Sequence, residues 1–210
     1  MNHREEQRIK NKYDKIASSY DAVIDRLIPN EWRRQAASYA SGNVLEVGIG
    51  TGLNLPYYTD KCLNLLGIDV SPGMLDRAKD RAVLSKVSVK LEEMDIQGTS
   101  LQSCSFDSVL SSFVFCTVPN PAIALLECQR ILKPGGRLIL LEHMSSRKPR
   151  LKQLMKFFEP LTVMLLGDHI NRDTDALVTK TGFIIKNEVN LLSDVVRLIV
   201  AEKLQVQERR

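Results

Sequence analysis

The stretch VLEVGIGTG at residues 44–52 constrains this chain more than any other. Its apolar run is broken by one acid, Glu46, and ends in three glycines at alternate positions, Gly48, Gly50 and Gly52. Such a run is typical of a buried parallel strand that feeds a tight turn. Glycine lets the backbone of that turn approach a ligand where any Cβ would collide. The stretch therefore predicts a strand and loop with a ligand close to the backbone.

The spacing of the glycines bears on which ligand this is. Leu53 stands where the dinucleotide fingerprint Gly-x-Gly-x-x-Gly requires its third glycine, so a pyrophosphate is not the first choice. Glu46 adds a carboxylate near the ligand, which suits a cationic group better than a phosphate. A second apolar run, residues 65–68, ends in Asp69. Neighbouring strands of a doubly wound sheet share one crevice, where Asp69 can accept both hydroxyls of a ribose. The expected ligand carries a ribose and a positive centre.

Four ordered motifs make the chain resemble the class I S-adenosylmethionine-dependent methyltransferases. They are EVGIGTG (46–52), LLGIDVS (65–71), FDSVLSSFVF (106–115) and LKPGGRLILLEH (132–143). The resemblance implies a Rossmann-like, doubly wound α/β fold. Its sheet would be seven-stranded and mostly parallel, with helices on both faces and an antiparallel last strand. The resemblance also implies S-adenosyl-L-methionine as cofactor and S-adenosyl-L-homocysteine as its product.

The resemblance also assigns cofactor contacts. In this family the glycine loop meets the aminoacyl part of the cofactor, and the acid that ends the second strand, here Asp69, holds the ribose. Asp95 would accept a hydrogen bond from the adenine amino group with Ile96 beside the ring, whereas Met74 either lies over the adenine or fills the core. The candidate cofactor residues are Tyr20, Glu46, Gly48, Gly50, Gly52, Asp69, Val70, Met74, Asp95, Ile96 and Ser111.

The methyl acceptor is expected just beyond the fourth strand. Ser111, Ser112, Phe113 and Cys116 are candidates there. Cys116 invites a nucleophilic interpretation, but no histidine or acid lies near it in the sequence. A small buried thiol is far commoner than a reactive one.

Methyl transfer is an in-line displacement that mainly needs the acceptor held at near-attack distance with water excluded. An amine must arrive neutral, so a nearby base can help. His143, at the end of the fifth strand, is the first candidate for this base. Asp168 and His169 follow, in the segment expected to cover the cleft. Each of the three can instead have a structural role.

Two helices are expected in the first 40 residues. Residues 4–20 space their apolar side chains as an amphipathic helix does, and residues 26–40 form the second helix. The first resembles the leading helix of ubiquinone-type and phospholipid methyltransferases, which implies a lid over the cofactor with Tyr20 as a contact. The alternative is a helix packed for stability alone. Further strands are expected at 87–91, 106–112, 137–142, 183–187 and 195–202, and further helices at 71–84, 122–132 and 172–181.

The composition shifts within residues 145–172, a segment expected as an acceptor-side insertion. Its five cations within ten residues alternate with apolar side chains; they are Arg147, Lys148, Arg150, Lys152 and Lys156. A cationic face beside an apolar stripe is typical of a helix that lies on an anionic membrane surface. The alternative is a solvated face on a helix that covers the active site.

The composition fits one domain over residues 1–210. At 44% hydrophobic and 26% charged residues, the chain can bury a substantial core and is globular. No apolar run reaches the roughly 20 residues that span a bilayer, and the polar start is no secretory signal. We therefore expect a cytoplasmic monomer, peripheral at a membrane, with no nucleic-acid partner. The scattered cysteines and three histidines indicate neither a disulfide framework nor a metal site.

The acceptor is the least determined part of this prediction. GTGLNLPYY (50–58), FVFCTVPNP (113–121) and the basic segment most resemble bacterial phosphatidylethanolamine N-methyltransferases, which implies a lipid amine. FVFCTV and LLEH (140–143) also resemble animal membrane-associated S-methyltransferases of small apolar thiols. A C-methyltransferase of a quinone precursor is the third candidate. The non-enzyme alternative is a catalytically silent cofactor-binding protein at a membrane surface.

Overall fold

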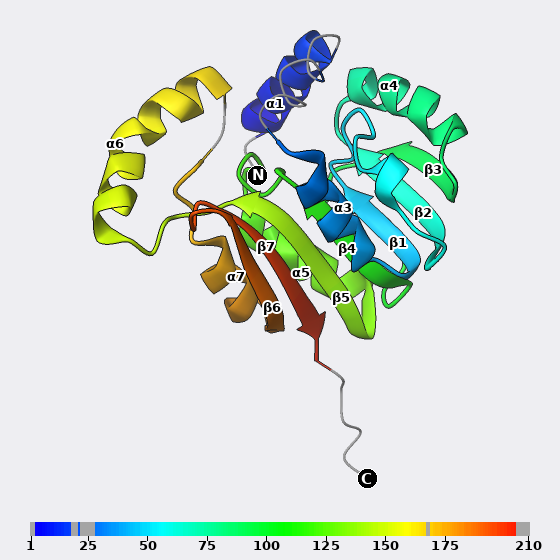
Figure 1. Ribbon diagram of the computed structural model, residues 1–210. Helices are drawn as coiled ribbons and strands as arrows, with labels where there is room; N and C mark the ends of the chain where they lie inside the picture. The colour runs from blue at the N-terminus through cyan, green and yellow to red at the C-terminus, as the bar shows by residue number, and fades with distance from the viewer. Residues whose placement is uncertain (1–2, 18–20, 22–27, 167–168, 205–210) are drawn as a thin grey trace.

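A single seven-stranded sheet organises the protein. The computed structural model describes residues 3–17, 21, 28–166 and 169–204 of the chain. The strands lie in the order β3-β2-β1-β4-β5-β7-β6, and β7 runs antiparallel to both of its neighbours (Figure 1). Their bounds are β1 (Gly42–Val47), β2 (Cys62–Asp69), β3 (Ser88–Glu93), β4 (Phe106–Ser112), β5 (Leu132–His143), β6 (Phe183–Leu192) and β7 (Val196–Lys203). The predicted doubly wound α/β fold is confirmed.

Alternation along β1 builds a separate core on each face of the sheet. Leu45 and Val47 point into a cluster that includes residues of α5 and α7, whereas Val44 points into a cluster that includes residues of α3 and α4. Because side chains alternate along a strand, Glu46 lies on the same face as Val44. This apolar strand therefore carries its one carboxylate into the second core.

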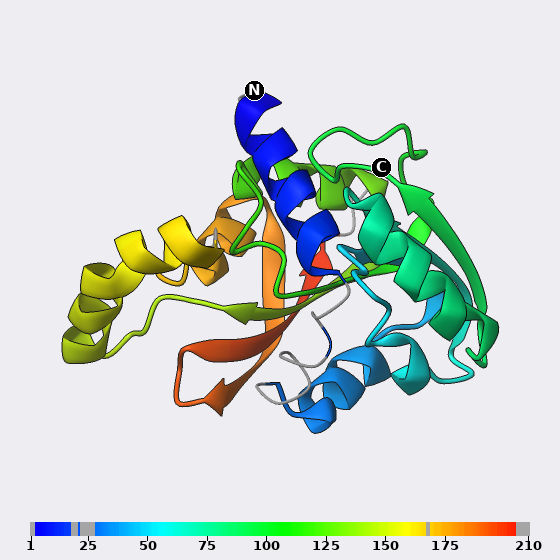
Figure 2. The same cartoon turned by 90° about the horizontal axis from the view of Figure 1, so that it is seen from above.

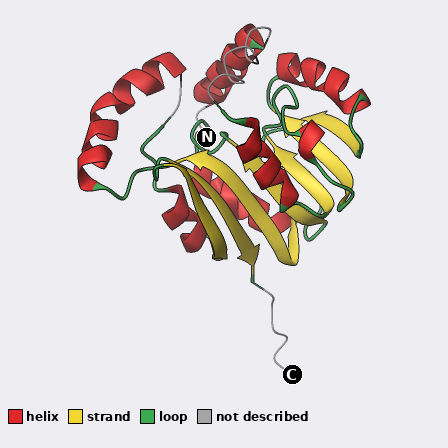
Figure 3. Ribbon diagram, in the orientation of Figure 1, coloured by secondary structure: helices red, strands yellow, loops and turns green. Residues whose placement is uncertain are grey.

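Helices cover both faces of the sheet (Figure 3). The helices of the described part of the chain, including α6, which stands apart, are α1 (His3–Ile16), α3 (Asn30–Ser38), the short 3-10 helix η1 (Leu55–Tyr57), α4 (Pro72–Val83), α5 (Pro121–Ile131), α6 (Pro149–Leu166) and α7 (Thr174–Lys180). Two begin at a side-chain cap followed by proline: Ser71 Oγ accepts from the Met74 N–H, and Asn120 Oδ1 accepts from the Ile123 N–H. Such caps satisfy backbone donors that have no partner within the helix.

Several element boundaries differ from the predictions. The helix expected over 26–40 is described from Asn30, after Pro29, and residues 22–27 lie outside the described part of the chain. β5 begins at Leu132 and not at residue 137, because Leu132 pairs with Phe106 before the Lys-Pro-Gly-Gly turn. β6 extends to Leu192 because it pairs with β7 along its length.

The helix α6 is placed apart from the two layers that cover the sheet. It projects to one side of the body in both views (Figures 1 and 2) and continues through Pro160. Among the described residues, no helix combines the length and the apolar character that crossing a bilayer requires.

Candidate active site

A cavity of about 370 Å³ opens where the carboxyl ends of β1 to β4 meet. The glycine loop, the ends of β2 to β4, the start of α4 and the inner face of α1 form its walls. Seven of the predicted cofactor residues line it: Gly48, Gly50, Asp69, Val70, Met74, Asp95 and Ile96. Of the acceptor-side candidates, Ser112 and Phe113 line it as well.

The glycine loop presents bare backbone to this cavity. Gly48, Gly50 and Gly52 all have left-handed φ angles, of 61°, 57° and 82°. A Cβ on Gly50 would meet no atom nearer than 4.0 Å, whereas one on Gly48 would lie 2.4 Å from Val114 Cγ2. A Cβ on Gly52 would lie 2.9 Å from Leu55 of η1 and 3.4 Å from Ala78 of α4, so this glycine allows close packing between these helices and lies outside the cavity lining.

Asp69 ends β2 at the wall of the cavity, where the backbone holds its carboxylate in place. Oδ2 accepts from the Gly50 N–H and Oδ1 from the Ser71 N–H, each at 2.9 Å. Burial raises the pKa of Asp69, while these N–H groups oppose the rise by stabilising the anion. A carboxylate has about four acceptor positions, so capacity for ligand hydroxyls remains.

Glu46 does not line the cavity. Its buried carboxylate accepts from Tyr58 Oη and from Asn54 Nδ2, both at 2.8 Å. Asn54 Nδ2 also lies 3.0 Å from Ser112 Oγ, and Asn54 Oδ1 accepts from Arg33. Burial raises the pKa of Glu46 to about 7, against the opposing hydrogen bonds from Tyr58 and Asn54. Glu46 thus holds the two residues that flank η1 and, through Asn54, the end of β4.

Ser111 also lies outside the cavity lining. It is buried, and its Oγ donates to Glu142 Oε1 at 3.2 Å. Side chains alternate along a strand, so Ser111 and Ser112 point to opposite faces of the sheet. Ser112, and not the predicted cofactor residue Ser111, lines the cavity.

The helix α1 lies across the cavity and is fastened on two sides. Asp14 Oδ1 accepts from Ser71 Oγ at 2.6 Å and from the Gly73 N–H at 3.0 Å, while Lys10 pairs with Glu93. Tyr13, between these two contacts, lines the cavity. The predicted contact Tyr20 lies outside the described residues.

Sequence reasoning missed two acids that join the amino-terminal segment to the site. One is Asp14; the other is Asp21, which accepts from Thr51 Oγ1 at 2.6 Å and from Arg81 Nη2 at 2.7 Å. Both belong to the run YDKIASSYD (13–21), in which the resemblance to the family pointed to Tyr20 alone. Its acids were the available signal.

Comparison with known proteins identifies the class of this site. The family model described as a methyltransferase domain matches residues 45–140. The chain is 33% identical over 141 residues to a phosphatidylethanolamine N-methyltransferase of Cereibacter sphaeroides, covering 65% of this chain and 69% of that relative. The chain belongs to the S-adenosylmethionine-dependent methyltransferases. It is also 30% identical over 173 residues to the ubiquinone/menaquinone biosynthesis C-methyltransferase UbiE of Geotalea daltonii, covering 77% of this chain and 74% of that relative.

Solved structures share the fold of this methyltransferase. A methyltransferase of Thermotoga maritima that depends on S-adenosylmethionine superposes with a TM-score of 0.68 at 21% identity. The superposition covers 91% of this chain and 98% of that one. At this level of identity the likeness establishes the fold, and the acceptor has to be argued from the site itself.

The catalytic candidates of this methyltransferase lie in different places. His143 is half-buried at the end of β5, and its ring centroid lies 4.9 Å from that of Phe113. Burial lowers the pKa of His143, which favours the neutral imidazole. The His169 N–H donates to the Cys116 carbonyl, and its Nδ1 lies 3.6 Å from Glu159 Oε1 on α6. Asp168 lies outside the described residues.

Glu142 supports the site through contacts that the sequence did not reveal. It is buried, and Oε1 accepts from the N–H groups of Val114 and Phe115 at 2.9 and 3.1 Å. These bonds hold the segment that follows β4 against the cavity. Within the described part of the chain, no group of three or more His, Cys, Asp or Glu side chains is placed to hold a metal ion.

Proposed function

We propose that this methyltransferase transfers methyl groups to the amine of phosphatidylethanolamine or a similar lipid. The observation that carries the proposal is the outer face of α6, which presents large apolar side chains and cations beside the active-site end of the sheet. The identity of 33% with the phosphatidylethanolamine N-methyltransferase of Cereibacter sphaeroides supports the same class of acceptor.

The cavity residues fit S-adenosylmethionine. The open side of Gly50 leaves backbone free for the aminoacyl group, Asp69 can accept the ribose hydroxyls, and Asp95 the adenine amino group. Gly48, Val70, Met74 and Ile96 complete this proposed contact set, while Glu46, Gly52 and Ser111 support it from behind. When bound, S-adenosylmethionine supplies a methyl group made electrophilic by its sulfonium.

His143 is the proposed base. An amine that gains a methyl group carries a positive charge and must release a proton before it can be methylated again. Because burial lowers its pKa, the His143 imidazole is neutral near neutral pH and has a ring nitrogen free of a proton. Asp168 and His169 are the alternatives, in a segment joined to α6 through the contact between His169 and Glu159.

The outer face of α6 suits a membrane surface. Leu154, Phe157 and Phe158 are 53%, 77% and 46% exposed, whereas Met155 points inwards and is buried. The rings of Phe157 and Phe158 pack edge to face, with centroids 5.2 Å apart. Aromatic and aliphatic side chains on one face of a helix are what enters the boundary between headgroups and acyl chains.

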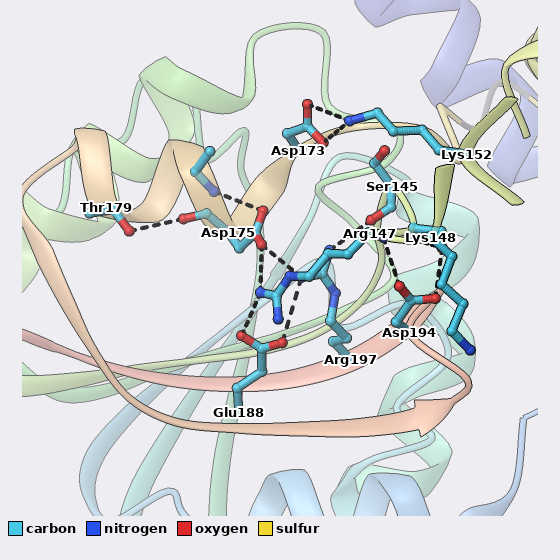
Figure 4. Close-up of polar contacts among 12 residues, drawn as sticks. Ser145, Arg147, Lys148, Lys152, Asp173, Asp175, Thr179, Glu188, Asp194 and Arg197 are labelled. Carbon is cyan, nitrogen blue, oxygen red and sulfur yellow. Dashed lines mark hydrogen bonds and ion pairs between the residues drawn. The ribbon is translucent and has the colours of Figure 1, made fainter. Parts of the chain in front are cut away.

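Three of the five cations predicted for this face serve contacts inside the fold (Figure 4). Arg147 pairs with Asp175 and Glu188, and Lys152 pairs with Asp173. Lys148 donates to Ser193 Oγ, a contact that lies outside the figure. Over the described residues, Arg150 and Lys156 make no hydrogen bond or ion pair and are exposed. These two cations, next to the apolar face, would attract anionic lipid. We therefore propose a cytoplasmic monomer that docks peripherally through α6.

One other acceptor has a specific observation in its favour. The alignment with UbiE spans 77% of this chain, more than the alignment with the lipid N-methyltransferase, which supports C-methylation of a quinone precursor. Such a precursor is also apolar and would also reach the cavity from a membrane.

A methyl-transfer assay with labelled S-adenosylmethionine tests the proposal. Phosphatidylethanolamine vesicles, a small alkyl thiol and a demethylated quinol are supplied in parallel, and the products are read by mass spectrometry. Label in the lipid headgroup is expected, and Asp69→Ala supplies the background. Label only in the quinol or the thiol would overturn the proposed acceptor. No label in any of them, with calorimetric binding of the cofactor intact, would favour the silent binding protein.

A further inference from the structure

Phe113 adopts a backbone conformation that bulky residues rarely adopt. Its φ is 57°, and among the described residues only Cys104 and Ser193 share a positive φ without being glycine. In the left-handed region a Cβ crowds the following carbonyl oxygen, which is unfavourable for any L-residue. Of these three residues, Phe113 alone lines the cavity. Strain of this kind persists at functional positions when surrounding contacts impose it.

The contacts that impose it come from β5 and from the glycine loop. The Phe113 N–H donates to the Leu141 carbonyl at 2.8 Å, and the next two N–H groups donate to Glu142 Oε1. Val114 fills the space that a side chain on Gly48 would need. The segment after β4 therefore has little freedom, which fixes the direction in which the Phe113 side chain leaves the backbone.

The order of the strands locates Phe113 relative to the reaction. Across β3, β2, β1 and β4, the cavity is lined in turn by Asp95, Asp69, Gly48 and Phe113, whereas His143 ends β5 next to Phe113 and lies outside the cavity lining. A nucleoside placed with its base at Asp95 and its ribose at Asp69 directs its reacting end towards Phe113. His143 follows next, with its ring tilted by 54° against that of Phe113. Phe113 thus lies in the cavity wall, directly beside the proposed base.

We propose that Phe113 determines specificity for nitrogen acceptors, an inference that rests on the proposed function. An aromatic face attracts a cation through its quadrupole and gives no such advantage to a neutral thiol. A methylated or protonated amine is a cation, so the ring would hold the acceptor nitrogen at each round of methylation.

One round of methyl transfer would give the Phe113 ring and the His143 ring different roles. The new N–C bond replaces the C–S bond of the donor, whose electron pair remains on sulfur. The nitrogen then carries a positive charge beside the Phe113 ring, and its proton passes to the neutral imidazole of His143. Glu142 is a positioning residue in this arrangement because it holds the backbone that aims the ring.

Phe113→Gly tests this role without adding strain, because glycine adopts a φ of 57° freely. The variant removes the ring and relaxes the backbone at once. Ser193→Gly is the matched control, since it relaxes a φ of 53° at a position that does not line the cavity. Phe113→Tyr keeps the aromatic face and serves as the rescue variant.

The assay measures KM for a water-soluble monomethylated amine carrying a short lipid tail, together with the dissociation constant of S-adenosylhomocysteine. For Phe113→Gly we expect KM to rise by about 10-fold or more, with cofactor affinity within about twofold of wild type and near-normal KM in Phe113→Tyr. An unchanged KM, or an equal loss of cofactor affinity, would overturn the inference while leaving the proposed function intact. If wild type methylates only thiols or quinols, the proposed function fails first and this inference fails with it.

Discussion

The backbone N–H of Gly50 donates a 2.9 Å hydrogen bond to Asp69 Oδ2, so the glycine loop and the acid that ends β2 form one unit. The loop fixes the carboxylate, and the carboxylate fixes the loop. Both lie at the cavity that we assign to S-adenosylmethionine. This relationship makes Asp69 the first residue to test.

Asp69→Ala should weaken cofactor binding strongly. A hydrogen bond to a charged group contributes about 1.5–3 kcal/mol, so losing two ribose contacts should raise the dissociation constant by about 100-fold or more. Calorimetric titration with S-adenosylhomocysteine measures this change. Asp76→Ala is the matched control, because Asp76 lies on α4 with an exposed side chain whose ion-pair partner among the described residues is Lys79. Equal affinities in both variants would contradict our assignment of the cavity.

Gly48→Ala and Gly50→Ala should fail in different ways. Each places a Cβ on a left-handed residue, at a cost of about 1–2 kcal/mol. In Gly48→Ala the new methyl also collides with Val114, and overpacking adds about 1–3 kcal/mol. In Gly50→Ala the methyl enters open space and should impair cofactor binding more than folding. Urea unfolding measures the loss of stability and calorimetry the loss of cofactor affinity in each variant. Equal losses in both variants would contradict the loop conformation described above.

Glu46 should make the stability of the protein depend on pH. Burial raises its pKa from 4.5 to about 7, so the folded chain keeps a proton that the unfolded chain releases between these values. The contribution of Glu46 to stability is therefore fully present below pH 4.5 and is lost as the pH rises through about 7. Over this range the free energy of unfolding should fall by about 3 kcal/mol relative to a variant that cannot titrate.

Glu46→Gln is that variant. Urea unfolding gives the free energy of unfolding of wild type and Glu46→Gln at each pH, both without cofactor. The difference between the two proteins should be constant in acid, and wild type should become less stable relative to the variant as the pH rises through neutrality. Only the difference between the two pH profiles matters, since the amide also alters the bonds from Tyr58 and Asn54. Parallel profiles would show that the carboxylate is solvated.

Short apolar runs were enough to predict individual strands, such as those around Val44, Leu66 and Leu110, because local sequence decides whether a strand is buried. The arrangement of these strands in one seven-stranded sheet came from the resemblance to the methyltransferase family. Asp69 was correctly expected at the cavity because it ends a predicted strand, whereas the position of Asp95 followed from the resemblance to the family.

Contacts between distant segments could not be predicted in this way. Glu46 was expected at the ligand, yet its partners Tyr58 and Asn54 turn it into the core, and this depends on how η1 folds back. The support that Glu142 gives to residues 114 and 115 joins two strands far apart in sequence. Spacing within one segment carries no information on such pairs, so they become visible only in three dimensions.

The last prediction concerns the cations on α6 and just before it, of which two pairs should contribute differently to membrane binding. Arg150 and Lys156 are exposed and make no ion pair with any described residue, whereas Arg147 and Lys152 are held by acids of the body. Near an anionic surface each cation contributes about 1 kcal/mol, so Arg150→Gln with Lys156→Gln should weaken binding to anionic vesicles by about 30-fold at low salt. Arg147→Gln with Lys152→Gln should affect vesicle binding less and lower the free energy of unfolding instead, because these cations neutralise Asp175, Glu188 and Asp173.

Salt and a surface control decide whether α6 is the part that docks. Raising the salt concentration should remove the difference between the first double variant and wild type, because screening weakens attraction between exposed charges. Phe157→Ser should weaken binding at every salt concentration, since it removes a ring that is 77% exposed on the same face. Val83→Ser is the matched control, because Val83 is 84% exposed at the end of α4. If Phe157→Ser and Val83→Ser bind vesicles equally well, the apolar face of α6 does not enter the lipid, and α6 is better explained as a solvated cover of the active site.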